Sequence, residues 1–283
     1  MNFAWVGAPL AAAVIGVALW LHTRRFGFLP EDPPVGSRKR HRMALPTVGG
    51  LVGVLASGAL LLGGASLAAL GAFVCTAVGL ADDRAKDRGS ELPLPWKVVP
   101  LLGAAIIAAV AAAGATASHL SPTGWAVAVL LAFVVINAIN FLDNTDGVAA
   151  AVGGTGLLLA SRDGLPAAAA LGWLFLGFLP FNWPRSRALL GDAGSLSLGF
   201  CLAVTTLDHG VAGGLRWSAL LAPIAVPILD FVQVVVARLC LGFAPWIGDR
   251  RHLTHIAMNN GLPHVLVAPV FAGLTAGLYG LLA

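Results

Sequence analysis

Long apolar runs separated by short polar stretches dominate the chain. Each run is close to the roughly 20 residues that a helix needs to cross a bilayer. None alternates between polar and apolar residues, which excludes a transmembrane β-barrel. The pattern predicts an all-α integral membrane protein, a single domain over residues 1–283 with about ten transmembrane helices. The expected spans are 3–22, 48–64, 66–81, 98–114, 124–141, 147–161, 165–183, 195–211, 218–240 and 264–282.

Composition supports this class. Of the 283 residues, 58% are hydrophobic and only 11% are charged, whereas charged residues make up about a quarter of a soluble domain. No basic segment precedes the first run, so we expect a retained span there and not a signal peptide. Cys75, Cys201 and Cys240 lie in apolar runs and are predicted to be packing residues. We expect no nucleic-acid partner, and a homodimer is left open.

The distribution of basic residues predicts the orientation. All of the 17 Lys and Arg residues except Arg162 and Arg216 fall in or next to four loops, 23–47, 82–97, 184–192 and 241–263. Ten alternating spans place these four loops on one face. The positive-inside rule makes that face cytoplasmic. We therefore expect a multi-pass protein of the inner (plasma) membrane with both termini outside.

Five segments on the predicted cytoplasmic face carry most of the side chains capable of chemistry. They read EDPPVGSRKRHRMALPTVGG, GLADDRAKD, NAINFLDNTDG, LLGDAGSLSLG and GDRRHLTH. In the second segment, Asp82 and Asp83 are costly at a membrane edge unless a cation or basic partner neutralises them. Lys86 lies one turn beyond Asp82 if the helix continues. A magnesium-linked carboxylate pair and a solvated helix end with an ion pair both explain this pattern.

The third and fourth segments add further oxygen ligands. Asn140 and Asp143 share a face if that segment is helical, while Asp146 suits a turn or a helix cap. Asp192 is followed by small residues, with Ser195 as the predicted N-cap of the next span. A helix N-terminus favours anions. Together with the basic loops, these segments predict a site for a phosphate-rich ligand, with Mg²⁺, or alternatively Mn²⁺, between ligand and carboxylates.

The remaining polar residues allow two interpretations each. The basic run that contains Arg38, Lys39 and His41 suits anionic lipid headgroups or a substrate phosphate. His252 and His255, next to Arg251, suit phosphate or sugar contacts, because a zinc site needs more ligands.

Asp230 lies inside a predicted span, where a carboxylate needs a partner. A structural hydrogen bond and a functional role are both open for this residue. Pro223 and Pro227, just before it, should break or bend the helix.

Taken in order, these segments resemble the polyprenyl-phosphate N-acetylhexosamine-1-phosphate transferases, a family that includes the phospho-MurNAc-pentapeptide translocase. The resemblance runs from Asp32 to His255. It implies ten transmembrane helices, a cytoplasmic active site and a bent ninth helix beside a lipid groove. It assigns catalytic roles to Asp82, Asp83, Lys86 and Asp143, and metal binding to Asp192 and Asp143. It assigns substrate binding to Asn137, Asn140, Asp146, Arg38, Lys39, His41, Arg251, His252 and His255.

Two positions depart from the family pattern. Thr254 stands where a further histidine is expected, and Asn144 replaces the first glycine of the DGxDG form. The second departure argues against the MurNAc-pentapeptide translocase itself. The resemblance thus implies transfer of a hexosamine 1-phosphate from a UDP-sugar to polyprenyl (undecaprenyl) phosphate with release of UMP, as the first membrane step of cell-envelope glycan synthesis. The alternatives are the translocase proper, a transporter that uses Asp230, and an inactive scaffold.

Overall fold

A computed structural model describes residues 6–23, 29–32, 44–114, 120–161, 167–212, 220–246 and 248–282. Helices form most of it, and its strands are only two residues long, so the predicted all-α class is confirmed. They are α1 (Gly7–Leu21), α2 (Gly49–Leu62), α3 (Ser66–Asp87), α4 (Leu94–Ala113), α5 (Pro122–Leu142), α6 (Val148–Ala160), α7 (Ala168–Leu176), α8 (Leu179–Asn182), α9 (Gly191–Ala212), the 3₁₀ helix η4 (Ala222–Ile224), α11 (Ala225–Cys240), α12 (Leu253–Asn259) and α13 (His264–Leu282).

Five helical segments within the described ranges are long and apolar enough to cross a membrane. They are α3, α4, α5, the η4–α11 segment and α13. Four shorter apolar segments correspond to α1, α2, α6 and the α7–α8 pair. The chain is therefore a multi-pass membrane protein, while the count of ten spans and the orientation stay predictions.

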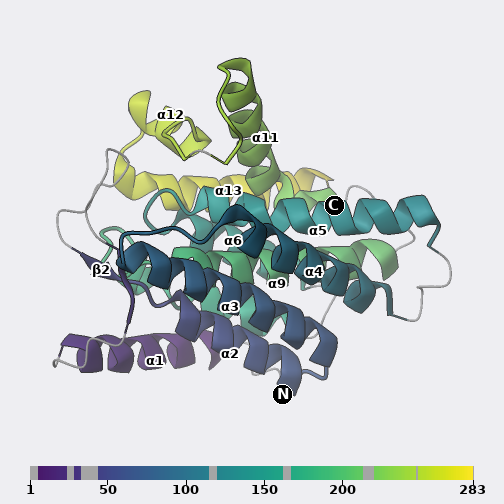
Figure 1. Cartoon of the computed structure of the whole chain (residues 1–283), viewed down its shortest axis with the longest axis horizontal. Coiled ribbons are helices and arrows are strands. Elements are labelled where there is room, and N and C mark those ends of the chain that lie inside the picture. Colours follow the sequence, from purple (N-terminus) through teal and green to yellow (C-terminus); the bar gives the residue numbers. More distant parts are fainter. Residues whose placement is uncertain are drawn as a thin grey trace.

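Helix α9 lies at the centre of the bundle. In Figure 1 most helices run along a common direction, with α9 behind α3 and α4. From Ala193 to Leu207 every α9 side chain is buried, including several serines and threonines. Glycine at position 79 allows α3 and α9 to approach closely, because a Cβ there would overlap the backbone nitrogen of Ala193. The start of α9 is thus packed directly against α3.

Helix α11 leaves the bundle. It rises steeply at the top of Figure 1, with α12 beside it. The predicted break is confirmed: Pro223 lies in the 3₁₀ turn and Pro227 in the first turn of α11. One face of α11 buries Asp230 and Arg238. The most exposed side chains of the opposite face are apolar, those of Leu229, Val232, Val236 and Leu239.

Three local predictions are corrected. Helix α9 begins at Gly191, so Ser195 lies inside it and donates a hydrogen bond to the Gly191 carbonyl (2.8 Å) instead of serving as the N-cap. The predicted span 165–183 is divided between α7 and α8. Cys240 is exposed at the end of α11 and is not a packing residue, unlike the buried Cys75 and Cys201.

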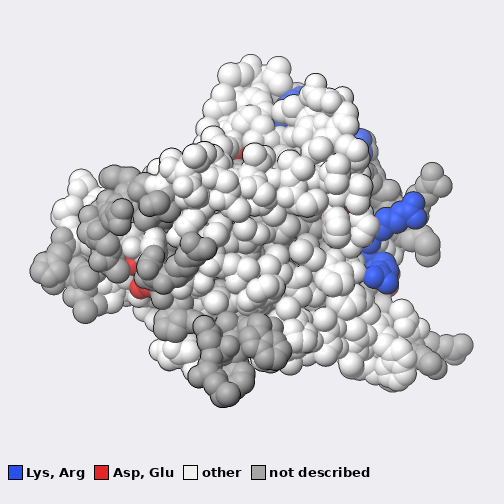
Figure 2. Space-filling view, turned by 180° about the vertical axis from the view of Figure 1, so that it is seen from behind, with Lys and Arg blue, Asp and Glu red and all other residues white. Residues whose placement is uncertain are grey.

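Backbone pairing ties together the loops at one end of the bundle. Strands β1 (Glu31–Asp32) and β2 (Leu45–Pro46) pair antiparallel. The Leu189 N–H donates to the carbonyl of Pro46, the last residue of β2 (2.9 Å). In Figure 2, which shows the molecule from behind, the visible Lys and Arg atoms lie on the right-hand and upper edges, and the right-hand edge corresponds to the β2 end of Figure 1.

Candidate active site

The two adjacent aspartates at the end of α3 have different partners. The Asp82 carboxylate is 1% exposed and lies 2.8 Å from Lys86 Nζ and 2.7 Å from Lys97 Nζ. Its other oxygen accepts the Leu92 N–H at 3.0 Å. The i,i+4 pair of Asp82 with Lys86 was predicted and is confirmed, because α3 continues to Asp87 as a regular helix.

Asp83 binds the beginning of α9. Its two oxygens accept the backbone N–H groups of Asp192 (2.9 Å) and Ala193 (3.2 Å). The first turn of a helix has unpaired N–H groups and a positive dipole end, and a carboxylate satisfies both. Gly191 makes this contact possible, since its φ of +65° suits glycine and a Cβ there would lie against the Asp83 carboxylate. Asp83 therefore supplies the cap that was predicted of Ser195.

Lys86 connects α3 with α9. Its Nζ lies 3.0 Å from Asp192 Oδ1 as well as 2.8 Å from Asp82 Oδ2. The ammonium group thus neutralises carboxylates on two helices that are distant in sequence. One cation shared in this way holds the Asp192 side chain close to the end of α3.

Asp143 comes from a third helix. It is the first residue after α5, which is joined to α9 by a hydrogen bond from Asn140 Nδ2 to Ser195 Oγ (2.9 Å). Within the described ranges, no hydrogen bond or ion pair engages the Asp143 carboxylate. Burial is the main cause that raises the pKa of Asp143 to about 8. The negative charges of Asp192, Asp83 and Asp146 also raise this pKa, whereas the positive charge of Lys86 lowers it.

These groups form an acidic cluster, which we define as Asp82, Asp83, Asp143 and Asp192 with Lys86 and Lys97. Asp82 and Asp192 pair with the two ammonium groups, Asp83 binds backbone N–H groups, and the four carboxyl groups outnumber the ammonium groups by two. Among the described residues, no three Asp, Glu, His or Cys side chains are close enough to hold a metal ion by themselves. The cluster nevertheless suits Mg²⁺, which usually takes one or two carboxylates and completes its shell with substrate phosphates and water.

Several predicted substrate-binding residues are held by the protein itself. Asn137 donates to the Phe133 carbonyl of its own helix (2.8 Å). Asp146 accepts the Ser186 hydroxyl at 2.6 Å and the Ser186 N–H at 3.3 Å. This contact fixes the turn between α5 and α6 against the loop before α9. Arg38, Lys39 and His41 lie outside the described residues.

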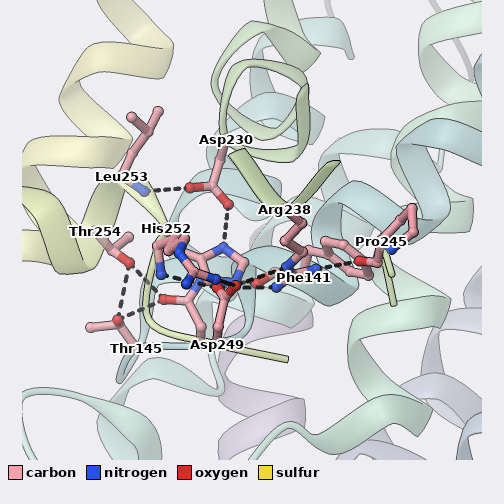
Figure 3. Close-up of polar contacts among 11 residues, drawn as sticks. Phe141, Thr145, Asp230, Arg238, Pro245, Asp249, His252, Leu253 and Thr254 are labelled. Atoms are coloured by element: carbon pink, nitrogen blue, oxygen red, sulfur yellow. Dashed lines mark hydrogen bonds and ion pairs between the residues drawn. The ribbon is translucent and has the colours of Figure 1, made fainter. Parts of the chain in front are cut away.

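A second polar cluster lies between α11 and α12 (Figure 3). The fully buried Asp230 carboxylate lies 2.8 Å from His252 Nδ1 and accepts the Leu253 N–H at 2.7 Å. Because a carboxylate only accepts hydrogen bonds, Nδ1 of His252 is the protonated ring nitrogen. His255, also buried, packs edge-on against His252 with ring centroids 6.2 Å apart. Asp230 thus has structural partners that account for a carboxylate at this depth.

Arg238 and Arg251 share one carboxylate. Arg238, 2% exposed, pairs with both oxygens of Asp249 (3.1 and 3.3 Å), and Arg251 approaches the same group at 2.6 Å. These charge-assisted bonds lower the pKa of Asp249 to about 2 against the opposing effect of burial. Arg238 also lies over the Phe141 ring at 5.1 Å, which connects this cluster to α5. The cluster therefore holds the loop between α11 and α12 in place.

Three contributing residues were not singled out from the sequence. Arg238 could have been found, because an arginine inside an apolar span needs a partner. Lys97 and Ser186 carry no comparable signal, since their partners lie in other segments.

Replacing Asp230 with alanine is expected to lower the stability of the protein by about 3 kcal/mol, because it leaves a buried histidine and a backbone N–H without their acceptor. Thermal unfolding of the purified protein in detergent measures this. Leu229→Ala, on the exposed face of the same helix, is the matched control and should shift the midpoint much less. Equal shifts for the two variants would contradict the assignment.

Comparison with known proteins identifies the family. Residues 65–210, more than half of the chain and including α3, α5 and the start of α9, match the model for glycosyl transferase family 4. The chain belongs to this family. The matched residues contain every carboxylate of the acidic cluster, whereas α12 and its histidines lie beyond them.

Three relatives illustrate the similarity of this chain to known proteins. A Bacillus subtilis protein, named as a probable undecaprenyl-phosphate N-acetylglucosaminyl 1-phosphate transferase, is 29% identical over 82% of this chain and 71% of its own length. The Mycobacterium leprae decaprenyl-phosphate N-acetylglucosaminephosphotransferase is 31% identical over 50% of this chain and 44% of its own length. The Escherichia coli undecaprenyl-phosphate alpha-N-acetylglucosaminyl 1-phosphate transferase is 28% identical over 92% and 78%.

Proposed function

We propose that this family 4 protein transfers an N-acetylhexosamine 1-phosphate from a UDP-sugar to polyprenyl phosphate and releases UMP. The observation that carries the proposal is the meeting of Asp83 and Lys86 of α3 with Asp192 of α9, beside the end of α5 that carries Asp143. The names of the compared relatives describe the same type of reaction. The presence of basic residues at the same end supports a cytoplasmic site in a plasma-membrane protein.

The reaction exchanges one pyrophosphate bond for another, so the main obstacle is kinetic: two anions have to meet. Asp192 and Asp143 would hold Mg²⁺, which supplies charge neutralisation at the diphosphate and at the departing UMP. Lys86 adds a fixed positive charge next to Asp192. Asp83 binds the start of α9 and so keeps Asp192 in place.

The acceptor phosphate would attack the β-phosphorus of the UDP-sugar in line with the departing UMP oxygen, as is usual for phosphoryl transfer. Its last proton leaves near neutral pH, with a pKa of roughly 6, so little help from a base is needed. The contacts of Asp82 agree with a small role for a general base, because its ion pairs with two lysines make its carboxylate poorly suited to accept a proton.

The lipid acceptor needs an apolar path that ends at the acidic cluster. Helix α11 offers one, because its most exposed side chains are apolar where it leaves the bundle. Its buried face is joined to α5 through Arg238 and Phe141. We infer that the polyprenyl chain lies along the exposed face of α11 while its phosphate reaches the end of α5.

Incubating the purified protein with undecaprenyl phosphate and a panel of UDP-sugars tests the proposal. We expect a lipid-linked sugar diphosphate and an equal amount of UMP with at least one UDP-N-acetylhexosamine, and no product in excess EDTA. The panel should include UDP-MurNAc-pentapeptide, which identifies the translocase alternative. Turnover that persists unchanged in EDTA would refute the proposed requirement for Mg²⁺. Absence of product with every donor would refute the transferase function.

A further inference from the structure

Asn144 and Thr254 are the two positions where the sequence departs from the pattern of the family it resembles. The structure brings them together although they are 110 residues apart: Thr254 Oγ1 donates a hydrogen bond to Asn144 Oδ1 at 2.6 Å. Thr145 Oγ1 lies 3.3 Å from the same Thr254 hydroxyl. These contacts join the turn after α5 to α12.

The Asn144 side-chain amide both donates and accepts hydrogen bonds. Nδ2 donates to the Phe141 carbonyl in the last turn of α5 (2.8 Å), which satisfies one of the free carbonyls at that helix end. Oδ1 accepts the hydroxyl of the neighbouring Thr145 (2.8 Å) in addition to that of Thr254. Asn144 therefore connects α5, the following turn and α12.

Thr254 is a fixed donor. It is fully buried in the first turn of α12, and the preceding residue, Leu253, is held through its N–H by Asp230 of α11. Figure 3 shows Thr254 and Thr145 on one side of the cluster and Asp230 on another. The hydroxyl is thus presented to the turn by a helix that is itself attached to α11.

The residue next to this pair is Asp143, whose carboxylate has no hydrogen bond or ion pair within the described part of the chain. No side-chain contact there fixes its direction. Its position depends on the backbone of the turn, which is held at the α5 end by the Asp143 N–H bond to the Ile139 carbonyl (3.1 Å) and on the other side by Asn144.

We propose that Asn144 and Thr254 form one positioning pair, which fixes the turn against α12 and so sets the location of the Asp143 carboxylate. Neither residue is assigned a contact with substrate. The inference rests on the proposed function for its effect on catalysis, while the mechanical link between the turn and α12 can be measured without it.

A double-mutant cycle tests the pair. Thr254→Val and Asn144→Ala are each expected to lower kcat by about tenfold or more. KM for the UDP-sugar should change by less than about twofold, because neither side chain is assigned a contact with the donor substrate. The double variant should lose little more than the more severe single variant. Thr254→Ser keeps the hydroxyl and should restore at least about half of the activity. Additive losses, or a Thr254→Val variant within about twofold of wild type, would overturn the proposal.

Two matched controls separate positioning from general damage. Thr275→Val removes a buried hydroxyl bond inside α13, and Asn260→Ala removes an exposed side-chain bond at the end of α12. Both should retain near-wild-type kcat. Loss of activity in these controls equal to that in the pair variants would also overturn the proposal.

Hydrogen exchange gives a readout independent of activity. The amides of 253–259 should exchange faster in Thr254→Val and in Asn144→Ala than in wild type or the two controls, since α12 loses its attachment to the turn. If the wild-type protein transfers no sugar, the proposed function fails, but the exchange result still decides whether the pair holds α12. Unchanged exchange in both variants refutes the link.

Discussion

Asp192→Asn is expected to abolish UMP release, a loss of about a thousandfold or more, with the fold intact. Asparagine keeps the size of the side chain and an oxygen that can accept a hydrogen bond from Lys86. It removes the negative charge that a bridging cation requires. The Asp192 backbone N–H, which binds Asp83, is unchanged. Radiolabelled or mass-detected lipid product, normalised to folded protein by size-exclusion chromatography, measures the loss.

Asp208→Asn is the matched control, because it makes the same change in the same helix near the opposite end of α9. It should leave turnover near the wild-type value. Residual activity of Asp192→Asn above about a tenth of wild type would rule out Asp192 as the principal metal ligand.

Lys86→Met is expected to reduce turnover by about a hundredfold or more, because it removes the positive charge beside Asp192 that we propose neutralises the substrate phosphates. Lys97→Met is a close comparison. Both lysines bind Asp82, at 2.8 and 2.7 Å, but only Lys86 also contacts Asp192. The loss in Lys97→Met should therefore be at least about tenfold smaller.

Measuring kcat and KM for both lysine variants separates two explanations. If neutralising the buried Asp82 were the main role of these lysines, the two substitutions would have the same effect on turnover and on thermal stability. Equal losses would contradict the assigned role of Lys86 at Asp192.

Sequence periodicity and composition were sufficient to predict the structural class of the protein. Hydrophobic runs predicted an all-α membrane protein, and the prolines before Asp230 predicted a break or bend, which lies at η4 and the first turn of α11. The ion pair of Asp82 with Lys86 was also predictable, because one turn of a continuous helix fixes that distance. The ordered motifs further indicated the family and the carboxylates of the site.

Tertiary structure alone decided how those carboxylates differ. Asp82 and Asp83 are adjacent in sequence, yet one binds two lysines and the other caps α9, because neighbouring residues on a helix point in different directions toward different packing partners. The pairs Asp230 with His252 and Asn144 with Thr254 likewise join distant segments. Spacing along the chain fixes contacts only within one helix, whereas contacts between helices depend on how the whole bundle packs. The sequence therefore determined which groups are present, and the fold determined which of them meet.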